Sequence, residues 1–519
     1  MKKLWRIVYS RTFLVVLSIL VAVGVIIAAV SFTANAIPAV WLALELFSIV
    51  VAVSIVNRPM NAAFKLTWIV FVLAIPVFGA LFYYILQSNL EVILYRRRFE
   101  YQAKALHDYI CEHDVYGHKA QDVLAQKDKE QLKLAHYMED YVGYPLHVNT
   151  DGQYFPSGEA MFKTLVEELK KAQRYIFMEY FIVDFGYMWD TILEILKEKA
   201  AQGVEVRFMY DGMNSLTLLP YSYYKTLRQY GIQAKVFSQI IPALSTVQNN
   251  RDHRKITVID GQVAFTGGVN LADEYINQIK RFGYWKDAAI MIKGEAVANF
   301  TLMFLQMWNF DTKEENDDFL YLQEHMANQK DTIQTDSVFL AYGENPFDGE
   351  EVARRVYLDM IQSARESIDI MTPYLVLDDE TIDNLTYAAK RGVQVRLLLP
   401  GIYDKQSAYL ASRTDFDLYL KAGIAIYEYT PGFVHAKVML VDGKRATVGS
   451  VNMDFRSLYL NFECGLYIYG HKQILADIAE DFEECLAQSK QVTLEEFQTT
   501  YPLYKRIIGC CMKILSPLM

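Results

Sequence analysis

Three long apolar runs open this 519-residue chain, over residues 12–32, 36–56 and 66–86. Each run is about as long as a helix needs to cross the hydrocarbon core of a bilayer. The pattern therefore predicts a membrane anchor of two to three transmembrane helices within residues 1–95. Pro76 predicts a kink in the third run, because proline interrupts the hydrogen bonding of a helix.

Charged residues around these runs bear on the processing and orientation of the anchor. Four basic residues precede the first run, and Ala34-Asn35-Ala36 is similar to a signal-peptide cleavage site. The run is longer than a usual signal-peptide core, which favours a retained anchor. Arg58 and Lys65 after the second run favour an amino terminus on the inner side of the membrane and a carboxyl-terminal part on the outer side. The triplet Arg96-Arg97-Arg98 favours the opposite orientation, so both topologies stay open.

From about residue 150 onward, strand-like runs alternate with helical ones, and the series occurs twice. Gly203-Val204-Glu205-Val206-Arg207 and Gly392-Val393-Gln394-Val395-Arg396 are near copies. Strands alternating with helices predict α/β halves with mainly parallel sheets. The polar stretch 311–337 separates them, which gives a first half over 96–320 and a second over 321–519. The expected helices cover 161–172, 192–201, 352–364 and 382–390. The expected strands cover 175–183, 204–210 and 393–399, and a further strand ends near Tyr374.

Composition narrows the range of partners. The chain is 52% apolar and 14% aromatic, with a formal net charge of −10. An acidic chain does not attract nucleic acid electrostatically, so nucleic acid is not expected as a partner. The five cysteines form no paired framework and no C-x-x-C pair, and we interpret Cys111, His113 and His118 as part of a solvated helical stretch. We expect no metal and no cofactor.

One short pattern occurs once in each half. The first copy is His253-Arg254-Lys255, then Asp260, then Gly267-Gly268-Val269-Asn270. The second copy is His435-Ala436-Lys437, then Asp442, then Gly449-Ser450-Val451-Asn452, at the same spacing. The segment between each lysine and its aspartate is strand-like, and residues i and i+2 of a strand point to one face. Each histidine is therefore expected to project beside its lysine, as a base or nucleophile next to a fixed cation.

Acidic residues supply further candidates. Asp287 and Glu463 occupy matching places near the start of the expected strands 285–292 and 461–468. We interpret them as carboxylates that bond the histidine Nδ1 atoms and orient the rings, although a surface carboxylate at the start of a strand fits the pattern as well. Asp260 and Asp442 each precede glycine, which is a turn signal, so their role is either catalytic or structural.

The two H-x-K-x4-D motifs resemble those of the phospholipase D superfamily. The resemblance implies two phospholipase D-like α/β halves in a pseudo-twofold arrangement, with both histidines in one cleft. It implies that His253 attacks phosphorus and that His435 acts as acid and then base, the reverse assignment also being open. The phosphate oxygens would be stabilised without a metal by the following residues: Lys255, Lys437, Asn270, Asn452, Gly268 and Ser450.

Longer stretches are similar to bacterial cardiolipin synthases, over about residues 60–519. They include Met178-Glu179-Tyr180, Thr372-Pro373-Tyr374 and Asn452-Met453-Asp454-Phe455-Arg456-Ser457. The resemblance implies a multi-pass protein of the bacterial cell membrane. Such a protein transfers a phosphatidyl group between two phosphatidylglycerol molecules and releases cardiolipin and glycerol. The extra run at 12–32 departs from the two-span anchor of many members.

Other functions would share the same motif residues. A phospholipase D-type hydrolase or another phosphatidyltransferase stays open, and a non-catalytic lipid-binding scaffold is a further alternative that two intact motifs oppose. The carboxyl-terminal stretch 504–518 mixes apolar and basic residues. It fits either an interfacial helix on a membrane surface or a helix packed on the second half.

Overall fold

A computed structural model of the chain describes residues 38–58, 60–75, 78–87, 95–99, 119–215, 218–239, 249–310, 321, 333 and 335–515. These residues fall into two compact units, 38–87 and 95–515. Several subjects of the sequence analysis lie outside the described residues. They are the apolar run 12–32, most of the polar stretch 311–337, and Cys111, His113 and His118.

The described part of the first unit consists of α3 (Pro38–Val56), α4 (Ala62–Ala74) and α5 (Phe78–Gln87). Across the described residues, no helix is both long and apolar enough to cross a membrane. The prediction of N-terminal transmembrane helices is therefore wrong for the runs 36–56 and 66–86. The second run forms the 19-residue α3, which carries the exposed carboxylate Glu45.

The third run is divided into two short helices. α4 has 13 residues and α5 has 10, which corresponds to about 20 Å and about 15 Å of rise. Both lengths fall short of the roughly 30 Å of a hydrocarbon core. The sequence places Pro76 between the two helices, where a missing amide hydrogen opposes continuation. Gly79 lets α5 approach α4, since a Cβ there would lie 2.7 Å from the carbonyl oxygen of Phe71.

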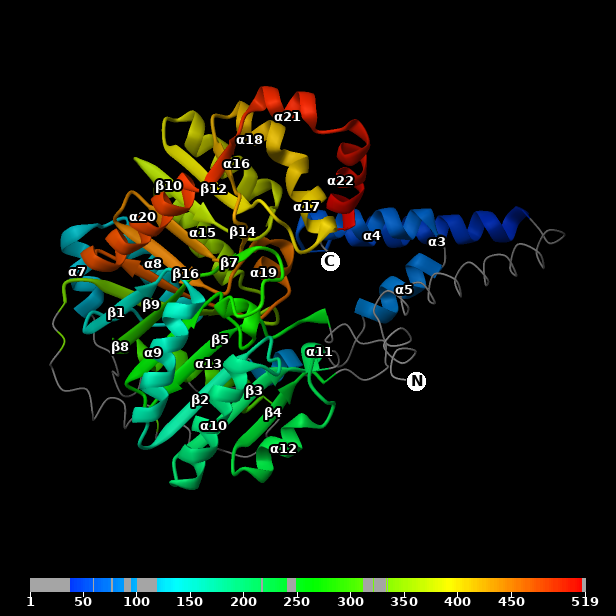
Figure 1. Ribbon diagram of the computed structural model, residues 1–519. Helices are drawn as coiled ribbons and strands as arrows, with labels where there is room; N and C mark the ends of the chain where they lie inside the picture. The colour runs from blue at the N-terminus through cyan, green and yellow to red at the C-terminus, as the bar shows by residue number, and fades with distance from the viewer. Residues whose placement is uncertain are drawn as a thin grey trace. The chain divides into compact units, whose positions relative to one another are not determined.

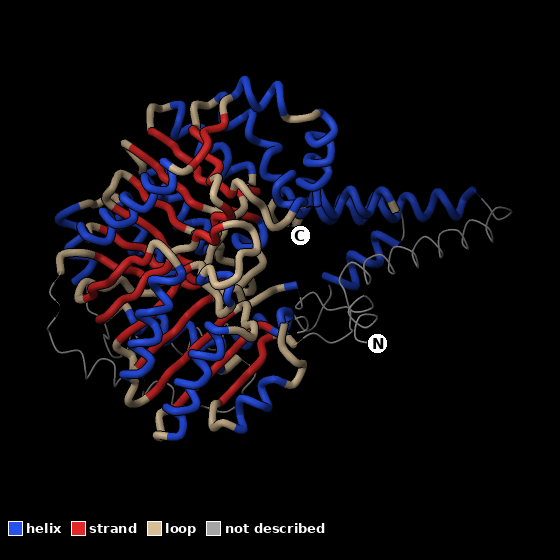
Figure 2. The backbone as a smooth tube through the Cα atoms, viewed as in Figure 1, coloured by secondary structure: helices blue, strands red, loops and turns tan. Residues whose placement is uncertain are grey.

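Two mixed sheets with one strand order form the centre of the second unit (Figures 1 and 2). The first has seven strands in the order β1-β8-β6-β5-β2-β3-β4. The second has eight, and from its β9 edge it reads β9-β18-β16-β15-β10-β12-β13-β19. The first seven positions match strand for strand, and β19 extends the edge. The prediction of two α/β halves is confirmed.

The first sheet contains β1 (Thr150–Phe155), β2 (Tyr175–Tyr180), β3 (Glu205–Asp211), β4 (Gln233–Phe237), β5 (Lys255–Ile259), β6 (Val263–Gly267) and β8 (Ala289–Gly294). The second contains β9 (Val338–Glu344), β10 (Ser367–Met371), β12 (Gln394–Pro400), β13 (Ala425–Tyr429), β15 (Val438–Val441), β16 (Arg445–Gly449), β18 (Glu463–Tyr469) and β19 (Ser489–Val492). Two short pairs lie outside the sheets: β7 (Tyr284–Lys286) with β14 (Gly432–Val434), and β11 (Leu375–Val376) with β17 (Met453–Asp454).

The expectation of mainly parallel sheets is wrong. In the first sheet only β2-β3 and β3-β4 run parallel, and in the second only β10-β12 and β12-β13 do. The motif strands β5 and β15 each turn back at once into an antiparallel partner, β6 or β16. The turns begin at Asp260 and Asp442, which have φ angles of 53° and 55°. So short a connection joins antiparallel strands, because a parallel crossover needs a dozen or more residues.

Helices complete both halves (Figure 1). α9 packs on β1 and β8, and α15 packs on β9 and β18. α13 contacts β2 and β5 of the first sheet and β9 of the second, so it lies between the two halves. Among the described residues, the helices of at least nine residues in this unit include α7 (Lys119–Lys127), α9 (Gly158–Lys171), α10 (Tyr187–Ala201), α13 (Val297–Trp308), α15 (Val352–Ser363), α16 (Asp379–Lys390), α20 (Lys472–Ala487) and α22 (Leu503–Leu515). Shorter ones include α8 (Gln131–Tyr137), η1 (Met138–Val142), α11 (Gly212–Ser215), α12 (Tyr223–Gln229), η3 (Asp273–Ile276), α17 (Gln406–Ser412), η4 (Arg413–Asp415), α18 (Phe416–Lys421), α19 (Phe455–Tyr459) and α21 (Leu494–Thr500).

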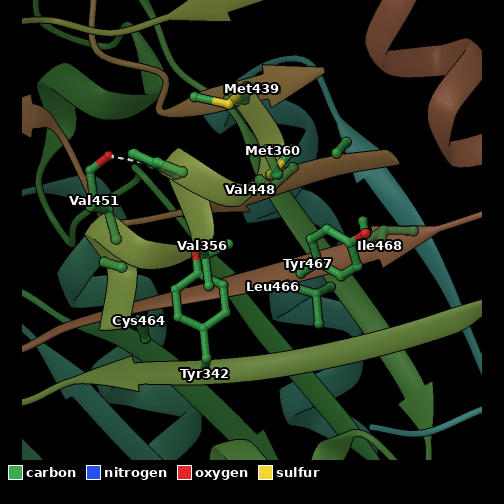
Figure 3. Close-up of a cluster of buried hydrophobic side chains, with 14 of the residues drawn as sticks. Tyr342, Val356, Met360, Met439, Val448, Val451, Cys464, Leu466, Tyr467 and Ile468 are labelled. Atoms are coloured by element: carbon green, nitrogen blue, oxygen red, sulfur yellow. Dashed lines mark hydrogen bonds between the residues drawn. The ribbon is translucent and has the colours of Figure 1, made fainter. Parts of the chain in front are cut away.

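One apolar core runs through both halves. It joins β1, β2 and β5 of the first sheet to the second sheet and to α13 and α15. Figure 3 shows the part under the second sheet, where Tyr342, Val448, Leu466 and Met360 gather. Tyr357 on α15 donates a hydrogen bond of 2.9 Å to the carbonyl oxygen of Val451, immediately before Asn452 of the second motif. The core thus fixes the strands that carry the site.

The carboxyl-terminal helix α22 packs on α17 (Figure 1). Gly509 makes the close approach possible, since a Cβ there would lie 2.6 Å from the carbonyl oxygen of Leu410. Lys513 forms an ion pair of 2.8 Å with Asp415. Apolar side chains on the other faces of α22 are exposed, namely those of Leu503, Tyr504, Ile507, Ile508, Ile514 and Leu515.

Candidate active site

The two motif histidines come directly before the central strands of the two sheets. His253 precedes β5 and His435 precedes β15, and each side chain is largely buried. The backbone amide of His253 donates to Phe462 O in the second half, at 2.9 Å, and that of His435 donates to Lys286 O in the first half, at 2.6 Å. Each motif is therefore fixed on the opposite half, as a two-fold relation between the halves would give.

The rings are oriented by the same exchange. His253 Nδ1 lies 2.8 Å from Glu463 Oε2, and His435 Nδ1 lies 2.7 Å from Asp287 Oδ2. Both carboxylates are fully buried. The alternative of a surface carboxylate at the start of a strand therefore does not apply. A carboxylate at Nδ1 makes that nitrogen the donor and leaves Nε2 with its lone pair. Each half therefore supplies the histidine of one pair and the carboxylate of the other.

Burial controls the charge of both histidines. Burial lowers the pKa of His253 to about 4, against the opposing effect of Glu463. Burial, and then the charge of Lys437, lowers the pKa of His435 to about 3. Burial alone would raise the pKa of Asp287 and of Glu463, but the neighbouring histidines and lysines lower both. At neutral pH the free protein therefore holds two neutral imidazoles beside two carboxylates.

The motif lysines belong to the same electrostatic cluster. Burial lowers the pKa of Lys255 to about 8 and that of Lys437 to about 7. The charge of each lysine also lowers the pKa of the opposite half's histidine, so the two half-sites act on one space. Lys255 Nζ donates to His253 O at 2.5 Å, and Lys437 Nζ donates to His435 O. Two buried ammonium groups in one site suit an anionic ligand.

The residues after the motif glycines differ between the halves. Ser450 Oγ donates to Glu463 Oε2, the oxygen that also bonds His253. Gly268 stands at the matching place and packs directly on Asp287, where a Cβ would lie 2.0 Å from Oδ1. Asn270 is occupied, because its Oδ1 accepts from Ile182 N at 3.0 Å and its Nδ2 donates to Tyr275 Oη at 2.9 Å. In the described structure, Oδ1 of Asn452 is buried without a hydrogen-bond partner.

The structure does not bring Asp260 and Asp442 to the histidines. Each follows the far end of its strand, which separates it from its motif lysine by about 17 Å of strand. Asp260 accepts from the backbone amides of Gln173, Arg174 and Tyr175 at 2.8–2.9 Å. Asp442 accepts from the amides of residues 365–367 in the same way. The sequence left a catalytic and a structural role open for these aspartates, and their contacts in the structure are those of a structural role.

Three aromatic rings within 5.4 Å of the histidine rings were missed by the sequence analysis. Phe181 lies 4.9 Å from the His253 ring, and Tyr275 and Trp285 lie 5.4 Å and 5.3 Å from the His435 ring. Trp285 Nε1 also donates to Asp287 Oδ2, at 3.4 Å. Only the position of Trp285, two residues before Asp287, gave a local signal. For the described residues, no group of three or more His, Cys, Asp or Glu side chains could hold a metal ion.

Comparison with known proteins agrees with the two-half fold. A family model described as "Cardiolipin synthase, PLD-like domain" matches residues 165–308 and 357–486, one segment in each half. A second, described as "Phospholipase_D-nuclease N-terminal", matches residues 46–87. The phosphatidylserine synthase of Haemophilus influenzae is similar in fold, with a TM-score of 0.56 and 15% identity, over 75% of this chain and 100% of that one.

Similar curated sequences extend over most of the chain. A cardiolipin synthase of Geobacillus sp. is 36% identical, over 90% of this chain and 91% of that protein. Cardiolipin synthase 2 of Bacillus anthracis is 36% identical, over 88% of this chain and 86% of that protein. An uncharacterized protein of Streptococcus mutans is 43% identical, over 90% of this chain and 98% of that protein. With both halves matched and these relatives covered almost throughout, the chain belongs to the PLD-like cardiolipin synthase family.

Proposed function

We propose that this protein is a phosphatidyltransferase that converts two phosphatidylglycerol molecules into cardiolipin and glycerol. The observation that carries the proposal is the reciprocal pair of histidine–carboxylate contacts, His253 with Glu463 and His435 with Asp287. Two oriented, neutral imidazoles and two buried lysines supply a nucleophile, a proton carrier and charge for a phosphodiester. The cardiolipin synthase names of relatives in Geobacillus and Bacillus support the lipid substrate.

In the first step, Nε2 of one histidine attacks phosphorus of a phosphatidylglycerol. The bond from phosphorus to the head-group oxygen breaks, and that oxygen takes a proton from Nε2 of the other histidine as glycerol leaves. The negative phosphodiester favours a protonated histidine in the substrate complex, although both rings are neutral in the free protein. The assignment of His253 as nucleophile and His435 as acid and base rests on family resemblance.

In the second step, the free hydroxyl of a second phosphatidylglycerol gives its proton to the now neutral second histidine. Its oxygen attacks phosphorus, the phosphorus–nitrogen bond breaks, and cardiolipin leaves with the first histidine restored. Lys255 and Lys437 offset the charge on the phosphate oxygens in both transition states. Asn270, Asn452, Gly268 and Ser450 shape the space behind them. Asp260 and Asp442 take no part in either step.

Both substrates are bilayer lipids, so the reaction takes place at a membrane surface, and nucleic acid is not a partner. A lipid acceptor confined to the bilayer plane has a high effective concentration, which favours it over water. The exposed apolar side chains of α22, such as Leu503, Tyr504 and Ile507, suit an interfacial helix. The proposed division is a membrane-associated region over 1–95 and catalytic halves over 96–320 and 321–519.

The experiment is lipid analysis after the full-length protein, reconstituted with phosphatidylglycerol alone, has been incubated beside a His435→Ala control. The expected result is cardiolipin with an equimolar release of glycerol, absent in the control. Phosphatidate without cardiolipin would instead establish a phospholipase D-type hydrolase, and the proposed function would fail. Cardiolipin formation that survives His435→Ala would overturn the two-histidine mechanism.

A further inference from the structure

A cluster of buried charged residues lies behind His253 in the first half. Asp252 and Arg254 flank His253 in the chain, and Glu179 comes from the neighbouring strand β2. Asp211 ends β3, and its Oδ1 lies 3.4 Å from Arg251 Nη1. All five side chains are at most 3% exposed. Charges buried at such density must be paired or neutralised, because an uncompensated buried charge is costly.

The charges balance only if the cluster holds a proton. Arg251 and Arg254 supply two positive charges, and Asp211, Asp252 and Glu179 supply three carboxyl groups. Among the described residues, both carboxyl oxygens of Glu179 and Oδ2 of Asp252 lack a conventional hydrogen-bond partner. Burial, and then the charge of Asp252, raises the pKa of Glu179 well above its usual value. Burial raises the pKa of Asp252 to about 7.

The cluster is tied to the groups that hold the catalytic ring. Asp252 Oδ1 accepts from Arg254 N at 3.3 Å, and Asp252 N donates to Asp211 Oδ2 at 3.0 Å. These bonds fix the main chain on both sides of His253. Arg254 Nε donates to the carbonyl oxygen of Glu463 at 3.2 Å, and Glu463 is the residue whose carboxylate orients His253. Both members of the histidine–carboxylate pair are therefore attached to the cluster.

The second half has apolar residues at the matching places. Glu179 pairs with Ile256 on β5, and Met371 pairs with Val438 on β15, each directly after a motif lysine. By the same register, Pro400 in the second half occupies the position equivalent to Asp211. By motif spacing, Val434 and Ala436 occupy the positions equivalent to Asp252 and Arg254. These four residues are all buried. A fold that keeps its second histidine in place with apolar neighbours does not need the charged cluster for folding alone.

We propose that Glu179 and Asp252 share one proton and, with Arg254, form a positioning unit that holds His253 against Glu463 in the first half-site alone. The unit makes the two histidines inequivalent, although the motifs around them are alike. None of its three residues is assigned a part in the transfer itself. The inference depends on the two-histidine phosphodiester chemistry of the proposed function, but not on the identity of the lipid.

The test compares Glu179→Met, which installs the second half's residue, with Glu179→Gln, whose amide can donate to ionised Asp252. The matched control is Met371→Leu, a volume-conserving change at the equivalent place. Substrates are bis(p-nitrophenyl) phosphate, a chromogenic phosphodiester, and phosphatidylglycerol. If only the lipid fails to react in the unaltered protein, the proposed lipid function fails while the positioning unit remains testable.

We expect Glu179→Met to lower kcat about tenfold or more with KM within about twofold, and to shift the pH profile of kcat. Glu179→Gln and Met371→Leu should each keep kcat within about threefold. Activity of Glu179→Met equal to that of the unaltered protein would overturn the proposal. So would equal losses in Glu179→Met and Glu179→Gln with an unchanged pH profile, because a packing role alone would give that result.

A second variant keeps the test decisive if Glu179→Met does not fold. Asp252→Asn retains the shape of the pair and provides an amide donor to Glu179. We expect it to keep kcat within about threefold and to flatten the pH profile near pH 7, where the Asp252 carboxyl would otherwise ionise. A loss of tenfold or more in Asp252→Asn, with the pH profile unchanged, would contradict the shared proton.

Discussion

The two half-sites agree in the groups that face the reaction and differ in what lies behind them. Each has a histidine, a lysine two residues later and a carboxylate from the opposite half. Behind His253 stand Arg254 and Asp252, whereas His435 has Ala436 and Val434. Beside the carboxylates, Ser450 donates to Glu463 where Gly268 only packs on Asp287. The groups that meet the substrate are thus duplicated, while their supports are not.

The largest effect is expected from the histidines, and it separates their roles. Either His253→Ala or His435→Ala should lower turnover of phosphatidylglycerol at least about 1000-fold, because each removes a group that both steps need. With bis(p-nitrophenyl) phosphate the leaving group needs no proton, so the variant that retains the nucleophile should still form a phosphoenzyme. Acid-labile radiolabel or mass spectrometry measures that intermediate. Phosphoenzyme in both variants would contradict a fixed nucleophile.

Exchange of Gly268 and Ser450 tests the second difference between the half-sites. Gly268→Ser places a Cβ 2.0 Å from Asp287 Oδ1, so the carboxylate must move away from His435. We expect kcat to fall about 10- to 100-fold, which corresponds to about 1.4–2.7 kcal/mol. Ser450→Gly removes one hydrogen bond to Glu463 and should lower kcat about tenfold or less. Steady-state kinetics checks the order, and a larger loss in Ser450→Gly would reverse our ranking.

The pH dependence distinguishes the two lysines. Burial lowers the pKa of Lys437 to about 7 and that of Lys255 to about 8, so their positive charges are lost as pH rises through these values. One histidine must gain a proton when the substrate binds, so kcat/KM should fall about tenfold per pH unit above about pH 4, the pKa of His253 in the free protein. Above about pH 7 the fall should become steeper, because one lysine is then neutral. This steeper part of the profile is the alkaline limb.

Arginine substitutions show which lysine sets that limb, because arginine does not lose its charge in this range. In Lys437→Arg the alkaline limb should move up towards pH 8, the value for Lys255. In Lys255→Arg it should stay near pH 7, the value for Lys437. Profiles are compared by shape, since both variants will be slower. An unmoved limb in Lys437→Arg would exclude Lys437 as its origin.

The smallest effect on chemistry is expected at the motif aspartates. Asp260→Ala and Asp442→Ala each leave backbone amides without their carboxylate acceptor, for instance those of Arg174 and Glu366. We expect the free energy of unfolding to drop by about 1–3 kcal/mol in either variant. The kcat of the folded fraction should stay within about twofold. Chemical denaturation and kinetics below the unfolding transition measure both, and a large kcat loss would return the aspartates to the active site.

Most helices and strands could be predicted from local patterns in the sequence. The strand expected over 204–210 is β3 (Glu205–Asp211), and the helix expected over 352–364 is α15 (Val352–Ser363), because apolar spacing reports these elements directly. Strand direction was missed, because a buried strand has the same composition in parallel and antiparallel neighbours. Run length in residues 66–86 suggested one transmembrane helix where the structure has α4 and α5.

The residues of the site could be predicted from the sequence better than the contacts between them. His253, Lys255, His435 and Lys437 follow from one repeated motif. The contact between His253 and Glu463 spans 210 positions of sequence and depends on how the halves dock. The cluster of Glu179 with Asp252 has no local signature either, since each residue alone resembles an ordinary charged position. Such features arise from tertiary packing, which spacing along the chain does not encode.

The exchange of carboxylates between the halves has a consequence for the history of the chain. A duplicated domain usually leaves a spare copy that is free to drift. Here an inactivating change at Asp287 in the first half disables His435 in the second, and a change at Glu463 disables His253. Neither half can therefore lose or change its function while the other half stays active, so the duplication provides no redundancy.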